Sequence, residues 1–318
     1  MISKFSPGLT TLVIGGGGYI GHFLVAQLVA SGRNVTVLGR SAKPRYEVPL
    51  GAKYIAGDFA HKNLICNILN THQEVIHLAY ATVPNTSFEN PLADLEQNLP
   101  ATVQLFAEVA RRGLKLVLVS SGGTVYGEAL SLPISEEHPT KPISPYGVTK
   151  LTLESYAFLY AMTHNLRFTC VRPANAYGTG QRPFIGQGFI ATAIASSIKG
   201  SAIKVFGQAG SVRDYLYVSD VASGIFHALE NGKLSEIYNL GSEVGLSNMD
   251  VIEKMRPIMK DIDCDIKVEH LPKRGFDVST NILNSQKLKS HTGWGPKVHF
   301  LDGLLTTRDW LWKHRHEF

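Results

Sequence analysis

A glycine-rich stretch at residues 15–21 places the tightest constraint on how this chain can fold. It reads Gly-Gly-Gly-Gly-Tyr-Ile-Gly, follows the apolar run Leu12–Ile14, and opens into Phe23–Ala30, whose composition favours a helix. A strand, a turn with glycine at every third position, and a helix together form the fingerprint of a dinucleotide site. Glycine lets the backbone turn tightly and approach a pyrophosphate, which then binds the free N–H groups at the helix N-terminus. We therefore expect cofactor binding here, and a glycine-rich loop without a ligand is the alternative. The predicted contacts are Gly15, Gly18, Tyr19, Ile20 and Gly21.

Strand and helix patterns alternate through the first half of the chain, and this order implies a parallel sheet with helices on both faces. Past residue 172 the pattern loosens into short, mixed elements. We predict an α/β fold, a Rossmann-like doubly wound parallel sheet with a smaller, mixed α/β C-terminal lobe. The predicted domains are a dinucleotide-binding domain over 1–172, which also includes about 209–232, and a substrate-binding lobe over 173–318. Strands are expected at Leu12–Ile14, Val35–Leu38, Lys53–Ala56, Val75–Leu78, Leu116–Ser120 and Phe168–Arg172, and long helices at Asp94–Arg111 and Tyr146–His164.

Composition excludes several classes of function. The net charge is only +5 over 318 residues, and no cluster of basic and aromatic residues indicates nucleic-acid binding. The three cysteines lie far apart and show no metal-ligand or disulfide spacing, so we expect no metal and a cytoplasmic location. No apolar run approaches the ~20 residues of a membrane span, so we expect no membrane partner.

The end of the second predicted strand indicates which nucleotide is bound. An acidic residue at this point would bind the adenosine ribose 2′-hydroxyl. The chain instead has Arg40 and Ser41 after Leu38-Gly39, and arginine pairs well with a 2′-phosphate. The cofactor is therefore predicted as NAD(P), with NADP favoured over NAD, and an ordinary surface arginine is the alternative. Asp58 and Phe59 follow the third strand, where the carboxylate could bind the adenine amino group or simply face solvent.

A tyrosine and a lysine four residues apart supply the candidate chemistry. Tyr146 and Lys150 share one face of a predicted helix. A phenol is a poor base at neutral pH because its reference pKa is about 10. A nearby ammonium and the positive nicotinamide ring would lower that pKa. Tyr146 could then remove a proton from a sugar hydroxyl while a hydride leaves for the nicotinamide, and Lys150 could hold the nicotinamide ribose.

With these motifs, the chain resembles the extended short-chain dehydrogenase/reductase family. Within that family it resembles the nucleotide-sugar epimerases and dehydratases, a group typified by UDP-galactose 4-epimerase. The resemblance runs nearly from end to end. It is carried by Gly15–Gly21, Val75–Ala79, Asn98, the Ser-Ser-Gly-Gly-Thr-Val-Tyr-Gly run at 120–127, Pro145–Lys150, Arg172–Asn175, Arg213–Tyr215, and Arg274 with Asp277.

The resemblance also implies roles for individual residues. Leu78, Ala79 and Tyr80 lie at a strand end beside the cofactor, and Asn98 braces the backbone of the active site. Asn175, Arg213 and Arg274 bind the diphosphate of a nucleotide sugar, although each arginine could instead form a structural ion pair. Gln187, Gly188, Phe189, Val205 and Phe206 correspond to the stretches that hold the nucleotide base.

One position departs from the family pattern. The family places serine or threonine where this chain has Gly122, and that hydroxyl bridges the tyrosine and the sugar oxygen. Thr124 and Ser121 are the remaining hydroxyls, with Thr124 slightly favoured and Ser121 left open. The sugar 4,6-dehydratases carry an Asp-Glu pair where this chain has Gly123 and Thr124, which disfavours dehydration.

The sequence therefore predicts an NAD(P)-dependent nucleotide-sugar 4-epimerase that acts on a UDP-hexose through a transient 4-keto intermediate. An NADPH-dependent reductase of a nucleotide 4-keto sugar is the alternative that Arg40 motivates. A non-catalytic cofactor-binding protein is the alternative that Gly122 motivates. From the family we also expect a homodimer, formed by the helices at Asp94–Arg111 and Tyr146–His164.

Overall fold

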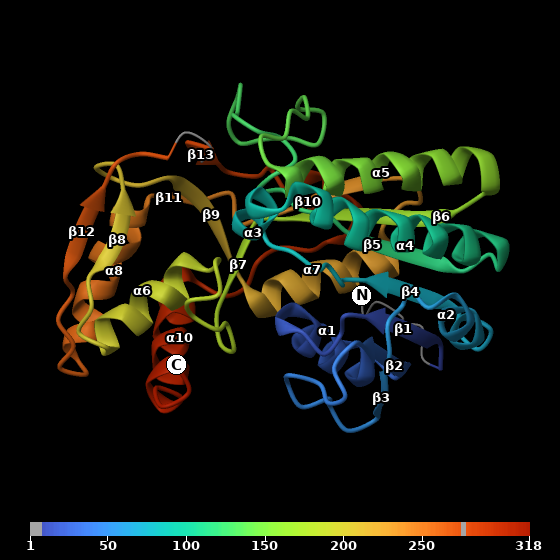
Figure 1. Ribbon diagram of the computed structural model, residues 1–318, viewed down its shortest axis with the longest axis horizontal. Helices are drawn as coiled ribbons and strands as arrows, with labels where there is room; N and C mark the ends of the chain where they lie inside the picture. Colours follow the sequence, from blue (N-terminus) through green and yellow to red (C-terminus); the bar gives the residue numbers. More distant parts are fainter. Residues whose placement is uncertain (1–7, 275–277) are drawn as a thin grey trace.

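Seven parallel strands form the central sheet of the protein (Figure 1). The structure is a computed structural model that describes residues 8–274 and 278–318. The strand order is β10-β6-β5-β4-β1-β2-β3, so the chain runs outward from β1 in both directions. The strands are β1 (Thr10–Ile14), β2 (Asn34–Gly39), β3 (Ala52–Ala56), β4 (Glu74–His77), β5 (Lys115–Val119), β6 (Arg167–Pro173) and β10 (Ile237–Leu240). Because the order reverses between β1 and β4, a crevice is expected at the carboxyl ends of these two strands.

Helices cover both faces of this sheet (Figure 1). One face carries α1 (Tyr19–Ala30) and α7 (Val218–Asn231), with α9 (Gln286–Thr292) packed against α7. The other face carries α2 (Lys62–Leu69), α4 (Pro91–Arg111) and α5 (Pro145–His164), and the short α3 (Pro84–Glu89) precedes α4. A buried apolar cluster lies under each layer, because the strands are apolar on both faces as a covered parallel sheet requires.

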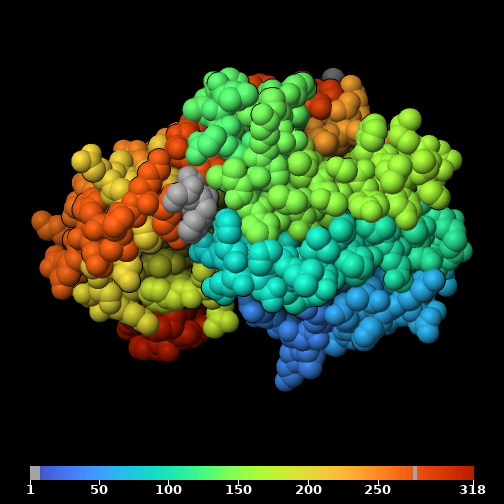
Figure 2. Space-filling view, turned by 45° about the horizontal axis from the view of Figure 1, so that its top comes forward, coloured from blue at the N-terminus to red at the C-terminus, as the bar shows by residue number. Residues whose placement is uncertain are grey.

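A smaller lobe packs beside the sheet, and the two parts lie next to each other in the space-filling view (Figure 2). Its first sheet contains β7 (Asn175–Tyr177), β9 (Val212–Tyr217), β11 (Gly245–Leu246) and β13 (Thr280–Asn281), and β8 (Ile203–Phe206) pairs with β12 (Val268–Leu271). Around them lie α6 (Phe189–Ile198), α8 (Asn248–Lys260) and α10 (Phe300–Lys313), which share a third apolar cluster.

The predicted fold class is confirmed. All six predicted strands and both predicted long helices occur, with bounds shifted by three residues at most. Strand β10 of the central sheet and helix α7, which packs against that sheet, both come from beyond residue 172. The chain therefore returns to the central sheet after it has entered the smaller lobe. Among the described residues, no helix combines the length and the apolar composition that crossing a membrane would require.

A buried ionic cluster holds the amino ends of the strands, opposite the crevice. Arg33, just before β2, donates from Nε to Oε2 of Glu74 at 2.9 Å and also pairs with Glu230 near the end of α7. Thr11 donates its hydroxyl to the same Glu74 oxygen at 2.8 Å. Both carboxylates are almost fully buried, so each depends on the guanidinium for compensation.

Removing Arg33 should therefore destabilise the fold strongly. Arg33→Met leaves two buried carboxylates without their cation, and we expect the free energy of unfolding to fall by about 3–5 kcal/mol. Arg256→Met is the matched control, because Arg256 forms an exposed pair with Glu253 and its loss should cost no more than about 1 kcal/mol. Urea unfolding followed by circular dichroism measures both. Equal stability of the two variants would contradict the importance of the buried cluster.

Candidate active site

A large cavity lies between the carboxyl ends of the central strands and the smaller lobe. Its volume is about 1120 Å³, and both parts of the protein contribute to its walls. The glycine turn after β1, the loops after β4 and β5, and the start of α5 form one wall. The segment from Pro173 to Ile190 and the strands β8 and β9 form the other.

The glycine turn adopts the geometry that a diphosphate needs. Gly15 has φ of +85°, and a Cβ there would lie 2.7 Å from the backbone nitrogen of Ala79. A Cβ at Gly21 would lie 2.5 Å from the carbonyl oxygen of Gly16, so α1 can approach the turn only without a side chain. Gly18 caps α1 without a side-chain hydrogen bond, and the first turn of α1 contains no acidic residue. The N-terminal N–H groups of α1 therefore remain available to an anion.

The predicted cofactor contacts divide into two groups. Gly15, Gly18, Tyr19, Ile20, Gly21, Leu78 and Tyr80 line the cavity, and the backbone of Ala79 lies against Gly15. Arg40, Ser41, Asp58 and Phe59 lie outside its lining. Arg40 and Ser41 are exposed after β2, and Asp58 accepts a hydrogen bond from the Ala60 nitrogen at 2.9 Å.

Asn98 braces the loop after β4, as the resemblance implies. Its side-chain oxygen accepts from the Ala81 nitrogen at 2.8 Å, and its amide group donates to the carbonyl oxygen of Asp94 at 2.7 Å. Asn98 itself is almost fully buried on α4. The loop that carries Leu78 and Tyr80 is thus fixed against a helix that lies outside the cavity.

Tyr146 and Lys150 both face the cavity from the first turns of α5. The hydroxyl of Ser144 accepts from the Gly147 nitrogen at 3.1 Å and caps this helix, and Ser87 accepts from the Tyr146 nitrogen at 3.2 Å. Lys150 Nζ donates to the carbonyl oxygen of Val119 at 2.9 Å and lies 5.7 Å from the centre of the Tyr146 ring. The predicted pair on one helix face is therefore present.

Burial opposes the charged form of both groups. It raises the pKa of Tyr146 above the ordinary value, the carboxylate of Asp94 raises it further, and a hydrogen bond with Ser121 acts in the opposite direction. Burial also lowers the pKa of Lys150 to about 8, although Cys170, Glu154 and Asp94 favour the charged form. The Tyr146 phenol is therefore held neutral, whereas Lys150 is still largely an ammonium at neutral pH.

The structure distinguishes between the two candidate hydroxyls. Ser121 is the one whose side chain acts on the Tyr146 phenol, where it lowers the pKa. Thr124, which the sequence slightly favoured, also lines the cavity, but its buried hydroxyl has no hydrogen-bond partner among the described residues. Ser120 was missed by the sequence analysis, although it belongs to the same run, and it lines the cavity with a buried hydroxyl that likewise lacks a partner in the described part of the chain.

Packing from the C-terminal part of the chain explains the glycine at 122. A Cβ at this position would overlap Cδ1 of Leu283 and lie 2.8 Å from the carbonyl oxygen of Arg172. Asn281 donates to the carbonyl oxygen of Gly122 at 3.0 Å and fixes the backbone there. The family hydroxyl therefore has no room at 122, and Ser121 provides the hydroxyl beside the phenol.

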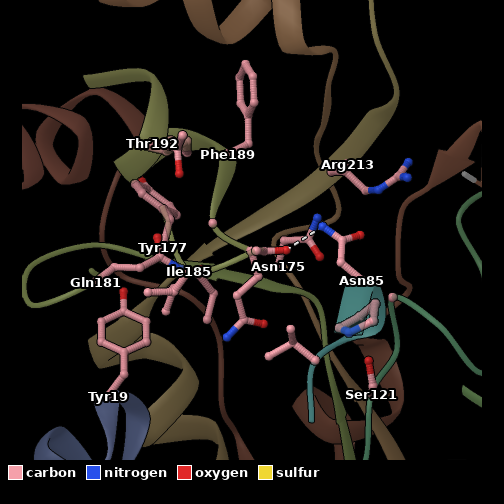
Figure 3. Close-up of a pocket in the computed structure, with 18 of the residues that line it drawn as sticks. Tyr19, Asn85, Ser121, Asn175, Tyr177, Gln181, Ile185, Phe189, Thr192 and Arg213 are labelled. Carbon is pink, nitrogen blue, oxygen red and sulfur yellow. Dashed lines mark hydrogen bonds between the residues drawn. The ribbon is translucent and has the colours of Figure 1, made fainter. Parts of the chain in front are cut away.

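Most predicted substrate contacts reach the same cavity. Asn175, Gln187, Gly188, Phe189, Phe206, Arg213 and Arg274 line it, and Figure 3 shows Asn175, Phe189 and Arg213 around the space that Ser121 borders. The guanidinium of Arg274 lies 3.6 Å from the centre of the Phe206 ring. Val205 is instead buried in the core of the smaller lobe, because alternate residues of β8 point to opposite faces. Asp277, named with Arg274 in the resemblance, lies outside the described residues.

Two further lining residues carried no recognisable signal in the sequence. Arg45 and Tyr46 come from the loop between β2 and β3, and Tyr46 donates its hydroxyl to the carbonyl oxygen of Gly180 at 2.5 Å. This contact connects a loop of the central sheet to the segment after β7. Only the folded chain brings these two regions together.

The fold, the glycine turn and the Tyr-Lys pair define a class of protein. Residues 11–241 match the NAD dependent epimerase/dehydratase family, so the chain belongs to that family. It is thereby an extended short-chain dehydrogenase/reductase.

Individual relatives show which members of this family the chain is similar to. The UDP-glucose 4-epimerase of Lactobacillus helveticus is 30% identical over 329 residues, which cover 97% of this chain and 98% of the relative. The solved UDP-glucose 4-epimerase of Thermotoga maritima, with UDP-glucose, matches with a TM-score of 0.90 and 30% identity over 96% of this chain and 99% of that one. The enzyme of the same name from Thermus thermophilus, in complex with NAD, matches with a TM-score of 0.86 and 32% identity over 95% and 98%.

The residues present fit the NAD that the family's name specifies. A Cβ would fill the space at Gly15, the N-terminus of α1 is uncapped by any side chain, and Ser120 presents an unsatisfied hydroxyl to the cavity within the described part of the chain. Unsatisfied buried polar groups are costly, which favours a ligand that satisfies them.

The packing around Gly122 leads to a prediction about stability. Gly122→Ser restores the hydroxyl of the family pattern, but it must displace Leu283 and backbone, so we expect destabilisation of about 1–3 kcal/mol. Gly295→Ser is the matched control, since a Cβ at Gly295 meets no atom within 4 Å. Chemical unfolding compares the two variants. A Gly122→Ser protein as stable as the control would show that the site tolerates a side chain there.

Proposed function

We propose that this protein is a nucleotide-sugar 4-epimerase that acts on a UDP-hexose through a transient 4-keto intermediate. The observation that carries this proposal is the meeting of Tyr146, Lys150 and Ser121 at one cavity, which Asn175 and Arg213 also line. The relatives from Lactobacillus helveticus and Thermotoga maritima support it, because both are UDP-glucose 4-epimerases.

The chain's own residues can handle the proton of such a reaction. Bound NAD supplies the acceptor and donor of hydride for the sugar C4, and the glycine turn, Ser120 and Lys150 would hold it. Ser121 accepts the hydrogen bond of the sugar O4 hydroxyl and relays its proton to the Tyr146 phenolate, which the Lys150 ammonium stabilises. The proton returns by the same path after the keto sugar has turned its other face.

The anionic half of the substrate has its own contacts. Asn175, Arg213 and Arg274 would hold the diphosphate by charge-assisted hydrogen bonds while the sugar reorients. Phe206, stacked under Arg274, offers an apolar surface at the same end of the cavity for the nucleotide base. Gly123 and Thr124 provide no carboxylic acid at the positions where the dehydratases use one, so epimerisation is favoured over dehydration.

Direct assay with sugar nucleotides tests the proposal. The folded protein, supplied with NAD+, should interconvert UDP-glucose and UDP-galactose or their N-acetyl forms, as measured by chromatography of the nucleotide sugars. Mass spectrometry of small molecules released on denaturation identifies the retained cofactor. Absence of interconversion with every UDP-hexose would remove the epimerase assignment and favour a non-catalytic cofactor-binding protein.

Substitutions in the cavity should separate the roles of the hydroxyls. Tyr146→Phe removes the base, and we expect kcat to fall by about 10²–10⁴-fold while cofactor stays bound. Ser121→Ala removes a hydrogen bond to the developing phenolate and should cost about tenfold or more. Thr124→Val should cost less than Ser121→Ala, because the Thr124 hydroxyl does not contact the phenol. The reverse order would transfer the relay role to Thr124.

A reductase of nucleotide 4-keto sugars is the second candidate, and Arg40 supports it. Its exposed position directly after β2 suits a 2′-phosphate, so we propose that NADP binds at least as tightly as NAD. Stoichiometric loss of NADPH absorbance with a keto sugar would establish the reductase. Turnover without net change in the cofactor would exclude it.

We also infer a homodimer that forms through α4 and α5. The outer faces of these helices expose Leu92, Leu95, Val148, Phe158, Leu159 and Met162. The same helices form a continuous surface in the space-filling view (Figure 2). Exposed apolar side chains on two packed helices suit an interaction surface, and a two-fold axis would place this surface of one copy against the same surface of the other. Sedimentation velocity measures the assembly.

A further inference from the structure

Tyr80 occupies an unusual place in the candidate site. It lies three residues beyond the end of β4, in the loop that Asn98 fixes, and it lines the cavity. The expected role of this loop concerns the cofactor, but the Tyr80 side chain is directed at the catalytic pair. Its ring centre lies 4.8 Å from that of Tyr146, in an edge-to-face arrangement.

The face of the Tyr80 ring covers the ammonium group of Lys150. Nζ lies 4.0 Å from the ring centre, well within the range of a cation–π interaction and closer than its 5.7 Å to the Tyr146 ring. The hydrogen bond to the Val119 carbonyl approaches Nζ from the strand β5. Lys150 is thus held between a backbone carbonyl and an aromatic face, with donors left for a ligand.

The hydroxyl of Tyr80 anchors the ring. It donates to Oδ2 of Asp94 at 3.4 Å, while burial and the Asp94 carboxylate raise the pKa of the phenol and keep it protonated. Asp94 is fully buried on α4, where it also accepts a hydrogen bond from Thr82. The phenol is therefore anchored to α4 through Asp94, and this bond helps to keep the ring over Lys150.

We propose, on the basis of the function proposed above, that Tyr80 is a positioning residue that holds the Lys150 ammonium beside Tyr146. The ring provides the negative face that a buried ammonium requires, and the bond to Asp94 keeps that face in place. Without the ring, Lys150 loses a contact that stabilises its charged form. A smaller charged fraction of Lys150 weakens the positive electrostatic field at the Tyr146 phenol.

Burial and neighbouring titratable groups also affect the pKa of Lys150. Burial lowers the pKa of Lys150 to about 8. The titratable groups that face it are Asp94 on α4, Glu154 and Tyr146 on α5, Cys170 on β6, His77 on β4, and Tyr80 itself. All of these except Tyr80 itself remain in a variant that changes only Tyr80, so a shift in the titration of Lys150 reports the loss of the ring.

Competitive labelling of Lys150 tests the proposal without any need for substrate. Acetic anhydride is applied to the folded protein across a pH series, and peptide mass spectrometry compares Lys150 with the exposed Lys43. In Tyr80→Leu and Tyr80→Gln we expect the labelling midpoint of Lys150 to fall by roughly half a pH unit or more. Tyr80→Phe keeps the ring but loses its bond to Asp94, so it should shift the midpoint by less than either non-aromatic variant. Thermal melting of each variant establishes that it is folded.

The possible outcomes separate this proposal from the proposed function. An unchanged midpoint in both non-aromatic variants overturns the positioning role, even if the protein interconverts UDP-hexoses. A shifted midpoint in a protein that turns over no sugar nucleotide supports the role of Tyr80 and removes the epimerase. Where turnover is present, the high-pH limb of kcat should move to lower pH in Tyr80→Leu and should move less in Tyr80→Phe, whereas a purely structural role would lower kcat without moving that limb.

Discussion

The burial of a phenol and an ammonium side by side is the constraint on which the rest of this site depends. Tyr146 and Lys150 lie one turn apart on α5, and burial pushes the pKa of the first up and that of the second down. Burial therefore keeps the phenol neutral, so Tyr146 is a weak base without a ligand, even though Lys150 is still largely an ammonium at neutral pH. A positive cofactor ring and a hydroxyl donor change this balance, because opposite charge nearby favours the phenolate. The surrounding contacts, from Ser121 to Tyr80, determine how much charge the pair can carry.

Two distant parts of the chain build the surroundings of this pair. The loops at the carboxyl ends of β1, β4 and β5 form one wall of the cavity, and the segment from Pro173 to Ile190 forms part of the opposite wall. Tyr46 and Asn85 connect these walls through hydrogen bonds to Gly180 and Gly186. The second of these bonds is drawn in Figure 3. The buried cluster around Arg33 lies at the amino ends of the strands, and the cavity lies at their carboxyl ends. The ionic cluster and the candidate site are therefore at opposite ends of the sheet.

The sequence predicted the features that local spacing determines and missed those that depend on distant packing. The glycine turn and the Tyr146–Lys150 pair each rest on residues within one turn or one helix, and their geometry follows from the backbone alone. The absence of a side chain at Gly122 depends on Leu283, about 160 residues away in the chain, because its Cδ1 occupies the space that a Cβ would need. Val205 was named together with Phe206 as a contact of the nucleotide base, but Val205 packs in the core, because which residues of a short strand face the core cannot be fixed without its neighbours.

The ionisation of Tyr146 tests the central claim most directly. The phenolate absorbance of the protein, taken as the difference between the parent and Tyr146→Phe, gives the pKa of this one group with and without NAD+. The account predicts a pKa above the ordinary tyrosine value in the cofactor-free protein and a clear decrease when NAD+ binds. A pKa that stays at the same value in both states would contradict it, because the buried pair would then be insensitive to the charge that is meant to activate it.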